Sequence, residues 1–103
     1  MDILPDPVVF DWDTGNSDKN WVKHKVEKQE SEEVFVNKPL LTYEDPEHSK
    51  TEKRFQAMGV TNKNRGLFLI FTIRNEKVRV ISVRDMNRKE EKTYEEAKKA
   101  AKI

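Results

Sequence analysis

The chain has 103 residues, 38% of them charged, with a formal net charge of +1 and no cysteine. Its length predicts a single domain over residues 1–103 with one hydrophobic core, and the lack of cysteine excludes disulfides, zinc–thiolate sites and thiol catalysis. No apolar segment reaches the length of a membrane span, and residues 1–30 lack the pattern of a secretory signal, so we expect a cytoplasmic protein that makes no membrane contact.

The two halves of the chain carry opposite charge. Residues 1–53 contain 7 Lys/Arg and 13 Asp/Glu, whereas residues 54–103 contain 13 Lys/Arg and 6 Asp/Glu. This asymmetry indicates a partner that meets only one half, and nucleic acid would meet the basic half. An ordinary solvated surface with the same segregation of charge is the alternative interpretation.

The first third of the chain predicts one strand and two helices. Residues 1–7, which include two prolines, are expected to be a loose N-terminus. Apolar and acidic residues alternate over Val8–Trp12, which predicts a short strand. After a turn with capping residues, the pattern predicts a short helix over Asp18–Lys25 and a second helix over Lys28–Val36.

The middle of the chain predicts consecutive strands. Leu40–Tyr43 is read as extended, and Arg54–Gly59 as a strand that ends in a glycine. Leu67–Ile73 is the longest apolar run, so we expect a strand that is buried on both faces. A polar turn at Asn75–Lys77 joins it to a β-branched strand over Val78–Val83, which makes an antiparallel hairpin.

The end of the chain predicts a helix over residues 87–102. Asn87 and Glu90 have the spacing of a capping box. Acidic residues precede basic ones along the segment, which complements the helix dipole. Beyond Tyr94 its apolar stripe consists of alanines, so we expect this helix to pack lightly.

These elements predict an α+β fold with the order β-α-α-β-β-β-α. Because the three later strands are consecutive, we expect a small antiparallel sheet with the first strand at one side, and with the two N-terminal helices packed on one face. The aromatic residues predicted to lie in the core, in preference to stacking on bases, are Trp12, Trp21, Phe35, Phe68 and Phe71.

A series of short motifs runs over residues 8–96. No single motif is specific, whereas their order and spacing over this span are. The motifs are Phe10-x-Trp12-Asp13, Asn20-x-x-Lys23-His24-x-Val26, Glu33-x-Phe35, Asp45-Pro46-x-His48-Ser49-x-x-Glu52-x-Arg54-Phe55, Gly59, Arg65, Phe71-Thr72-x-Arg74, Arg79-Val80-Ile81-Ser82-x-Arg84 and Tyr94-Glu95.

This series resembles the BrnT family of type II toxins. The resemblance implies a RelE-like fold and a ribonuclease that arrests translation in the bacterial stress response. It also implies an antitoxin partner, a BrnA-like protein with a ribbon–helix–helix DNA-binding domain, whose complex with the toxin represses their own operon. Operator DNA would then be contacted only through the antitoxin, and a homodimer within the antitoxin complex is left open.

Two positions depart from the family pattern. Lys25 stands where a glycine is usual, and Glu27-Lys28 stands where Ser-Phe is usual. A glycine directly after a helix serves as a left-handed C-cap, a conformation that lysine adopts only at a cost. These departures affect local packing more than chemistry.

RNA cleavage without a metal uses the 2′-hydroxyl of the substrate as nucleophile, and it needs a base, an acid and cations near the phosphate. The expected catalytic residues are His48, Glu52, Arg65, Arg84 and His24. The expected RNA-binding residues are Lys23, Arg54, Arg74, Arg79 and Tyr94. For Lys23 and His24, a favourable contact of a cation with the end of a helix is the structural alternative. We expect no cofactor and no metal site, because the chain has two histidines and no cysteine.

The geometry expected of these residues leaves alternatives open. His48 and Glu52 would share a face if one helical turn includes both, and otherwise they would be a cap and a surface ion pair. Arg65 and Arg84 stand at strand ends and are expected to converge on one anion, because a guanidinium fork matches phosphate. Solvent-exposed strand ends with routine charges are the alternative for both. Arg79 is a candidate only if its face of the sheet is open to RNA.

Mainly from this resemblance, with the arginine-rich hairpin in support, we predict an endoribonuclease toxin of a type II toxin–antitoxin system. It would cleave RNA by attack of the 2′-hydroxyl and so inhibit translation, with an RNA substrate and the antitoxin as partners. Two alternatives come from other classes of protein. One is a degenerate toxin that holds its antitoxin as a regulatory protein, and the other is a translation inhibitor that binds the ribosome without cutting RNA.

Overall fold

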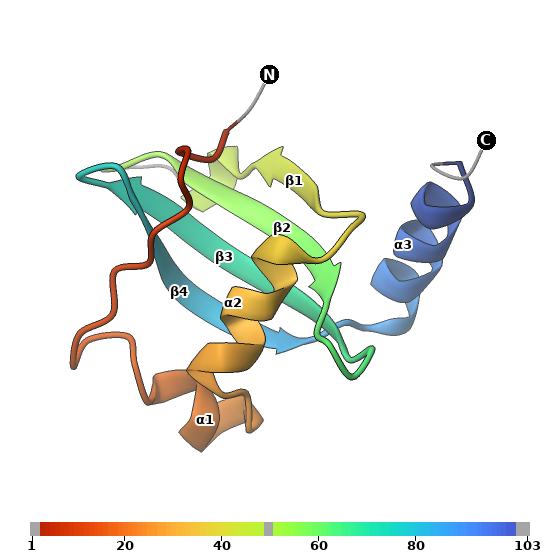
Figure 1. Cartoon of the computed structure of the whole chain (residues 1–103), viewed down its shortest axis with the longest axis horizontal. Helices are drawn as coiled ribbons and strands as arrows, with labels where there is room; N and C mark the ends of the chain where they lie inside the picture. The colour runs from red at the N-terminus through yellow and green to blue at the C-terminus, as the bar shows by residue number, and fades with distance from the viewer. Residues whose placement is uncertain (1–2, 49–50, 101–103) are drawn as a thin grey trace.

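The computed structural model describes residues 3–48 and 51–100, and its centre is one antiparallel sheet. Within these ranges four strands form the sheet in the order β1-β2-β3-β4: β1 (Leu41–Glu44), β2 (Arg54–Val60), β3 (Gly66–Arg74) and β4 (Lys77–Asp85) (Figure 1). Each strand pairs with the next along the chain, because the connections are too short to cross the sheet. The predicted α+β class and the antiparallel pairing of the last three strands are confirmed.

Helices flank the sheet at both ends of the chain. α1 (Lys19–His24) and α2 (Lys28–Val36) precede the strands, a 3₁₀ turn η1 (Pro46–His48) follows β1, and α3 (Arg88–Ala100) follows β4. In Figure 1, α2 crosses the front of the sheet and α3 stands beside it. None of the helices in the described ranges is long and apolar enough to cross a membrane.

The register divides the sheet into two faces, because successive side chains of a strand alternate. The face under α2, which we call the helix face, carries Phe55, Ala57, Leu67, Leu69, Phe71, Val78, Val80 and Val83. The opposite face, which we call the open face, carries Arg54, Gln56, Met58, Phe68, Ile70, Thr72, Arg74, Arg79, Ser82 and Arg84. A β-bulge shifts the register between Ile70 and Phe71 of β3, and both faces stay continuous across it.

The main core lies between the helix face and α2. Val34 and Phe35 of α2 are buried in one cluster with Phe71 of β3. The rings of Phe35 and Phe71 meet edge to face with their centres 5.2 Å apart, and the ring of Phe10 lies 5.4 Å from that of Phe35. Full burial of one such side chain stabilises the fold by about 1.5–3 kcal/mol, so this layer holds the N-terminal half on the sheet.

A smaller cluster lies on the open face beneath α3. Met58, Met86 and Tyr94 are buried there. α3 begins with the predicted capping box, in which the Glu90 N–H donates to the Asn87 side chain at 2.8 Å and the Asn87 N–H donates to the Glu90 carboxylate at 2.9 Å. Tyr94 is the buried residue of this helix, so the prediction that it packs lightly is confirmed.

The strand predicted over Val8–Trp12 is wrong. Within the described chain, this segment makes an isolated parallel bridge between Phe10 and Val78, on the outer edge of β4. The N–H of Asp11 donates to the Val78 carbonyl at 2.8 Å, and the Val78 N–H donates to the Val9 carbonyl at 2.7 Å. The alternating apolar residues pack against the main core without forming a ladder, and the first strand of the sheet is β1. The predicted order β-α-α-β-β-β-α is therefore replaced by α-α-β-β-β-β-α.

Two predictions of burial are also corrected. β3 is not buried on both faces: Leu69 is fully buried, whereas its neighbour Ile70 is half-buried, because α2 covers one face and α3 covers only part of the other. Trp21, predicted to lie in the core, is 46% exposed. It sits on the outer side of α1, a helix of six residues, with the Lys25 ammonium 5.3 Å from the ring centre.

Left-handed backbone occurs at two places that matter below. Lys25, directly after α1, has a φ of 56°, so the strained conformation expected where the family has glycine is confirmed. Its N–H donates to the Trp21 carbonyl at 2.9 Å and so closes the helix. Asn75 and Glu76, with φ of 53° and 63°, form the tight turn between β3 and β4.

Candidate functional site

Three arginines from different strands meet around a small pocket on the open face. It has a volume of about 150 Å³ and is lined by Arg54, Arg74, Arg79, Glu52, Gly15, Asn16, Val80 and Ile81. We call it the arginine pocket. Its lining includes three guanidinium groups and one carboxylate, and a guanidinium fork matches the geometry of a phosphate group.

The strand register explains why these arginines meet. Arg54 opens β2 and lies opposite Thr72 of β3, which in turn lies opposite Arg79 of β4. Arg74 follows Thr72 by two residues, so its side chain leaves the same face. Thr72 is buried, and its hydroxyl donates to the Lys53 carbonyl at 2.7 Å. The ends of three neighbouring strands therefore carry the three guanidinium groups.

Glu52 pairs with Arg74 at this pocket. The Nη2 atom of Arg74 lies 3.0 and 3.2 Å from the two carboxylate oxygens of Glu52. The two side chains are 47% and 31% exposed. An ion pair this open to water contributes about 0–1 kcal/mol, so a phosphate can replace the carboxylate on Arg74 with little loss of free energy.

Asp13 holds Arg79 in a bidentate fork. The Nη1 and Nη2 atoms of Arg79 each donate to one carboxylate oxygen of Asp13 at 2.9 Å, and Asp11 lies 3.5 Å from Nη1. The hydrogen bond from Arg79, followed by one from the Gly15 N–H, lowers the pKa of Asp13. The same bond to Asp13 raises the pKa of Arg79. Both groups are charged at neutral pH, and Arg79 reaches the pocket in a fixed orientation.

The turn before α1 positions Asp13, and the sequence did not reveal this role. The N–H of Gly15 donates to Asp13 Oδ1 at 2.8 Å, and the N–H of Asp13 donates to Asn16 Oδ1 at 2.8 Å. Asn16 is buried, and its amide donates to the Val80 carbonyl at 3.0 Å. A Cβ on Gly15 would come within 3.1 Å of Arg79 Nη2, so the glycine leaves room for the guanidinium. The local sequence signalled a turn, but the partners of that turn lie in β4.

The expected pairing of His48 with Glu52 falls partly outside the described residues. His48 is the last residue of η1. Residues 49–50 lie outside the described ranges, and Glu52 follows in a bend. The helical turn that would bring both side chains to one face is therefore a prediction that these residues leave untested.

Arg65 directs all five of its N–H donors into the fold. Its Nε and Nη2 atoms donate to the two carboxylate oxygens of Asp85 at 2.6 and 3.1 Å. Nη1 donates to Glu30 at 3.1 Å and to the Lys25 carbonyl at 3.0 Å, and Nη2 also donates to the His24 carbonyl at 3.3 Å. The bond to Asp85 is the main cause that raises the pKa of Arg65 and lowers that of Asp85. Arg65 thus joins the end of α1, the start of α2 and the end of β4.

Arg84 lies on the other side of the sheet from this cluster. Its guanidinium donates to the two carboxylate oxygens of Glu90 at 2.8 and 3.0 Å and lies 4.4 Å from the centre of the Phe68 ring. Arg65 meanwhile bonds to Asp85, which follows Arg84 and so points to the helix face. The expectation that Arg65 and Arg84 converge on one anion is wrong, because adjacent residues of a strand point to opposite faces.

The remaining predicted residues also lie outside the lining of the arginine pocket. Lys23 and His24 stand in the last turn of α1, where a cation favours the helix dipole. Lys23 is exposed and His24 is half-buried. Tyr94 is the buried residue of α3. Its hydroxyl donates to the Pro39 carbonyl at 2.6 Å, and burial raises its pKa. These contacts make Tyr94 a packing residue of α3.

The predicted site residues therefore separate into two groups at opposite ends of β3. Arg65 precedes this strand and Arg74 ends it, and at about 3.3 Å per residue they are roughly 30 Å apart. We call the group of Arg65, Glu30 and Asp85 the arginine hub. Ion pairs between the two halves of the chain neutralise part of the charge asymmetry. Carboxylates of the acidic half pair with arginines of the basic half: Glu30 with Arg65, Glu52 with Arg74, and Asp13 with Arg79.

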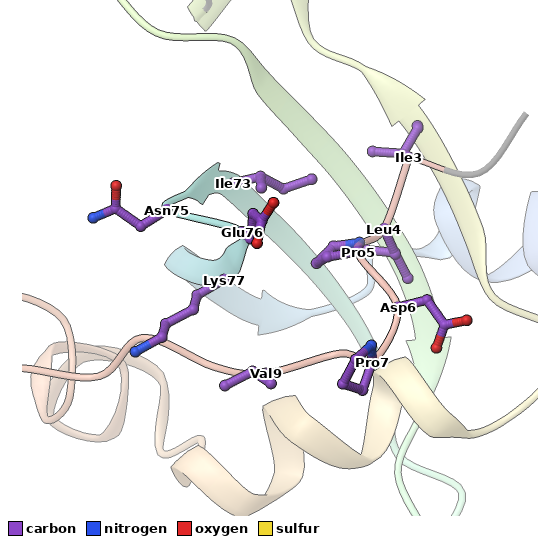
Figure 2. Close-up of a pocket in the computed structure, with 10 residues that line it drawn as sticks. All are labelled: Ile3, Leu4, Pro5, Asp6, Pro7, Val9, Ile73, Asn75, Glu76 and Lys77. Carbon is purple, nitrogen blue, oxygen red and sulfur yellow. The ribbon is translucent and has the colours of Figure 1, made fainter.

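A larger hollow of about 570 Å³ lies between the N-terminal segment and the β3–β4 turn. Figure 2 shows residues 3–7 and Val9 along one wall, and Ile73 with residues 75–77 along the other. Its charged lining residues are Asp6, Glu76 and Lys77, so carboxylates outnumber cations there. It suits a phosphate less well than the arginine pocket does.

The arginine pocket combines two kinds of group that phosphoryl transfer uses. Its guanidinium groups can stabilise charge that develops on phosphate oxygens. The Glu52 carboxylate can accept a proton from a hydroxyl placed beside that phosphate. Acid–base chemistry on a phosphodiester is therefore within reach of these side chains.

A protein-family model matches residues 12–90, which is most of the chain. The family is described as ribonuclease toxin, BrnT, of type II toxin-antitoxin system. The matched span contains Asp13, Glu52 and the three arginines of the pocket, and also the arginine hub. No curated protein matches the chain.

Proposed function

Because the chain belongs to the BrnT family of ribonuclease toxins of type II toxin–antitoxin systems, we propose that it cleaves RNA at the arginine pocket by metal-independent attack of the 2′-hydroxyl. One observation carries this proposal: Arg54, Arg74 and Arg79 meet Glu52 around a single pocket on the open face. Together they supply cations for the scissile phosphate and a base beside it.

In the proposed reaction, Glu52 takes the proton of the 2′-hydroxyl as that oxygen attacks phosphorus. The 5′ oxygen leaves with a proton from a second group, for which His48 is our candidate. The products are a 2′,3′-cyclic phosphate and a free 5′-hydroxyl. Because Arg74 holds the Glu52 carboxylate in the free protein, a phosphate that takes over Arg74 releases this base at the moment of binding.

The family implies an RNA substrate and an antitoxin partner. We further infer a RelE-like fold, inhibition of translation, an antitoxin with a ribbon–helix–helix domain, and repression of the shared operon by the complex. Catalytic roles of His24, Arg65 and Arg84, and RNA contacts of Lys23 and Tyr94, stay predictions. The contacts of Arg65 and Tyr94 favour structural roles for these two.

The test is cleavage of a 5′-labelled single-stranded RNA by the purified chain in the presence of EDTA. We expect new ends that carry a 2′,3′-cyclic phosphate. Arg74→Ala is expected to slow cleavage about 10²–10³-fold, the usual loss for one group that stabilises transition-state charge. Glu52→Gln keeps the shape of the side chain and is expected to slow it about 10²–10⁴-fold. Unchanged rates in both variants, or loss of cleavage with EDTA, contradict the proposal.

The matched control is Arg88→Ala, which removes the same charge from an exposed position at the start of α3. Its cleavage rate is expected to equal that of the parent. Induction of the parent in cells separates the alternatives. Growth arrest without new RNA ends favours a ribosome-binding inhibitor, and no arrest together with co-purification of a small DNA-binding chain favours a regulatory protein.

A further inference from the structure

A row of side chains crosses the open face next to the arginine pocket. The register places Tyr43 of β1 opposite Gln56, Gln56 opposite Ile70, and Ile70 opposite Ser82 of β4. All four side chains leave the same face, because strand neighbours in register share a face. We call these four residues the transverse row.

The transverse row is open over most of its length. Tyr43 is 46% exposed, and Gln56, Ile70 and Ser82 are half-buried. The next row of side chains toward α3 includes Met58 and Phe68, and that row packs with Tyr94. Ile70 belongs to neither core cluster. Within the described residues, α3 therefore stops short of this row and leaves an aromatic ring and an apolar floor exposed to solvent.

The arginine pocket borders the same row. Arg54 precedes Gln56 by two residues on β2, so its side chain leaves the same face. It is therefore a diagonal neighbour of Tyr43, at about 7–8 Å between backbone positions. That distance is within reach of a long side chain and a ring. One ligand can therefore reach both, with a phosphate beside Arg54 and a neighbouring group over the ring of Tyr43.

We propose that the transverse row is a base-stacking track for single-stranded RNA, in which one nucleobase stacks on the ring of Tyr43 while its phosphate occupies the arginine pocket. This inference rests on the proposed function and names a part of the substrate surface that lies outside the pocket. Every base has a π-face, so the stacking site tolerates sequence. Gln56 adds a hydrogen-bonding group beside it, and Ser82 adds one at the other end of the row. A paired base is already stacked within its helix, which is why the track takes a single strand.

Charge favours nucleic acid over an apolar protein segment as the occupant. One border of the row carries the three guanidinium groups of the arginine pocket, where Arg74 pairs with Glu52 and Arg79 pairs with Asp13, whose side chain is 55% exposed. Arg84, which pairs with Glu90, lies on the border near α3. Single-strand binding surfaces combine aromatic rings with cations in this way.

The test is binding of a labelled oligoribonucleotide with 2′-O-methyl riboses, which cannot attack its own phosphate, followed by fluorescence anisotropy. Tyr43→Ala is expected to weaken binding about 5- to 150-fold, the usual loss of one base–aromatic stack. Tyr43→Phe keeps the ring and is expected to bind as the parent does. Tyr43→Leu keeps an apolar side chain on the strand without a π-face and is expected to behave like Tyr43→Ala.

The matched control is Trp21→Ala, which removes an aromatic side chain of equal exposure, 46%, from α1. Its affinity is expected to be unchanged. A second strand with one abasic position tests the contact directly. When the missing base is the one that stacks on Tyr43, its loss is expected to weaken binding to the parent but not to Tyr43→Ala.

The outcomes separate this inference from the proposed function. If Arg74→Ala weakens binding and lowers its salt dependence while Tyr43→Ala and Tyr43→Leu bind as tightly as the parent, the pocket holds RNA and the stacking track is wrong. If Trp21→Ala weakens binding as much as Tyr43→Ala does, stacking is not specific to this row and the track is again wrong. If neither Arg74→Ala nor Tyr43→Ala changes affinity, both proposals are overturned.

Discussion

Arg65 and Arg74 stand at the two ends of β3, and the fold uses them in opposite ways. Arg65 has five protein acceptors for its five donors and a side chain that is 29% exposed. Arg74 is paired with the carboxylate of Glu52, and its side chain is 47% exposed. One guanidinium holds helices to the sheet, whereas the other stays available for exchange with an outside anion.

This difference teaches that the residue type alone does not identify a phosphate-binding arginine. What decides is the number of donors that remain free to change partner, and the desolvation of the pair that would have to break. A saturated fork such as Arg65 gives up several charge-assisted bonds if it turns to a ligand. An exposed pair such as Arg74–Glu52 gives up about 0–1 kcal/mol.

The largest expected effect tests the closed end of the sheet. Arg65→Ala removes every bond of the arginine hub and leaves Glu30 and Asp85 without their cation, so we expect a loss of about 2–4 kcal/mol in the free energy of unfolding. Urea unfolding measures it. Arg74→Ala is expected to lose less than about 1 kcal/mol under the same conditions. Equal losses at both positions would end the distinction between the two ends.

Arg65→Lys sharpens the same test. Lysine keeps the positive charge but cannot reproduce the planar fork that spans Asp85 and the carbonyls at the end of α1. We expect most of the stability loss of Arg65→Ala to persist in this variant. Full recovery by lysine would mean that net charge, and not the fork, makes the hub.

A smaller effect is expected from the backbone beside the hub. Lys25 has a φ of 56°, where an L side chain is strained and glycine is not. Lys25→Gly is therefore expected to stabilise the fold by about 1 kcal/mol, measured as the shift in urea midpoint. Lys25→Ala is the control, because it removes the ammonium near Trp21 but keeps the Cβ. A gain in Lys25→Ala equal to that in Lys25→Gly would assign the effect to charge and contradict the backbone explanation.

The smallest expected effect compares carboxylates at the two ends. The pKa of Asp85 is lowered by Arg65, and that of Asp13 by Arg79, from an ordinary value of 3.8. A carboxyl whose pKa is lower in the folded state stabilises the fold above pH 3.8, and this contribution disappears as the pH falls through the folded pKa. Asp85→Asn, at a side chain 60% exposed, is expected to lose at most about 1 kcal/mol at pH 7.

At pH 3 and below, the stability of the parent is expected to approach that of Asp85→Asn. Asp13→Asn is expected to show the same direction of pH dependence at the pocket end. Urea unfolding at pH 7 and pH 3 on the three proteins measures both. A difference between parent and variant that stays constant over this range would show that the ion pair is not its source.

Local pattern was enough for the elements that rest on local contacts. The capping box of Asn87 and Glu90, the helix over Lys28–Val36 and the hairpin around Asn75 were predictable, because their hydrogen bonds and turn geometry involve residues close in sequence. The light packing of α3 followed from its thin apolar stripe. The strain at Lys25 followed from a lysine at a position where the family has glycine.

Long-range partners explain most of the misses. The segment Val8–Trp12 alternates as a strand does, yet whether it joins a ladder depends on the free edge of β4, nearly seventy residues later in the sequence, where it makes one bridge. Trp21 looked like core by type, but its burial depends on which side of a short helix meets the sheet. Arg65 and Arg84 looked like one anion site, but the alternation of β4 sends their contacts to opposite faces.

By itself the sequence determined the α+β class, the run of antiparallel strands, the helix caps and the set of arginines from which a phosphate site can be built. Only the tertiary structure decided which arginines those are. The hydrogen-bond donors of each arginine meet carboxylates and carbonyls that lie far away in the sequence, such as Asp13 for Arg79 and Glu30 for Arg65. Such pairings arise when strands and helices pack, so no local pattern contains them.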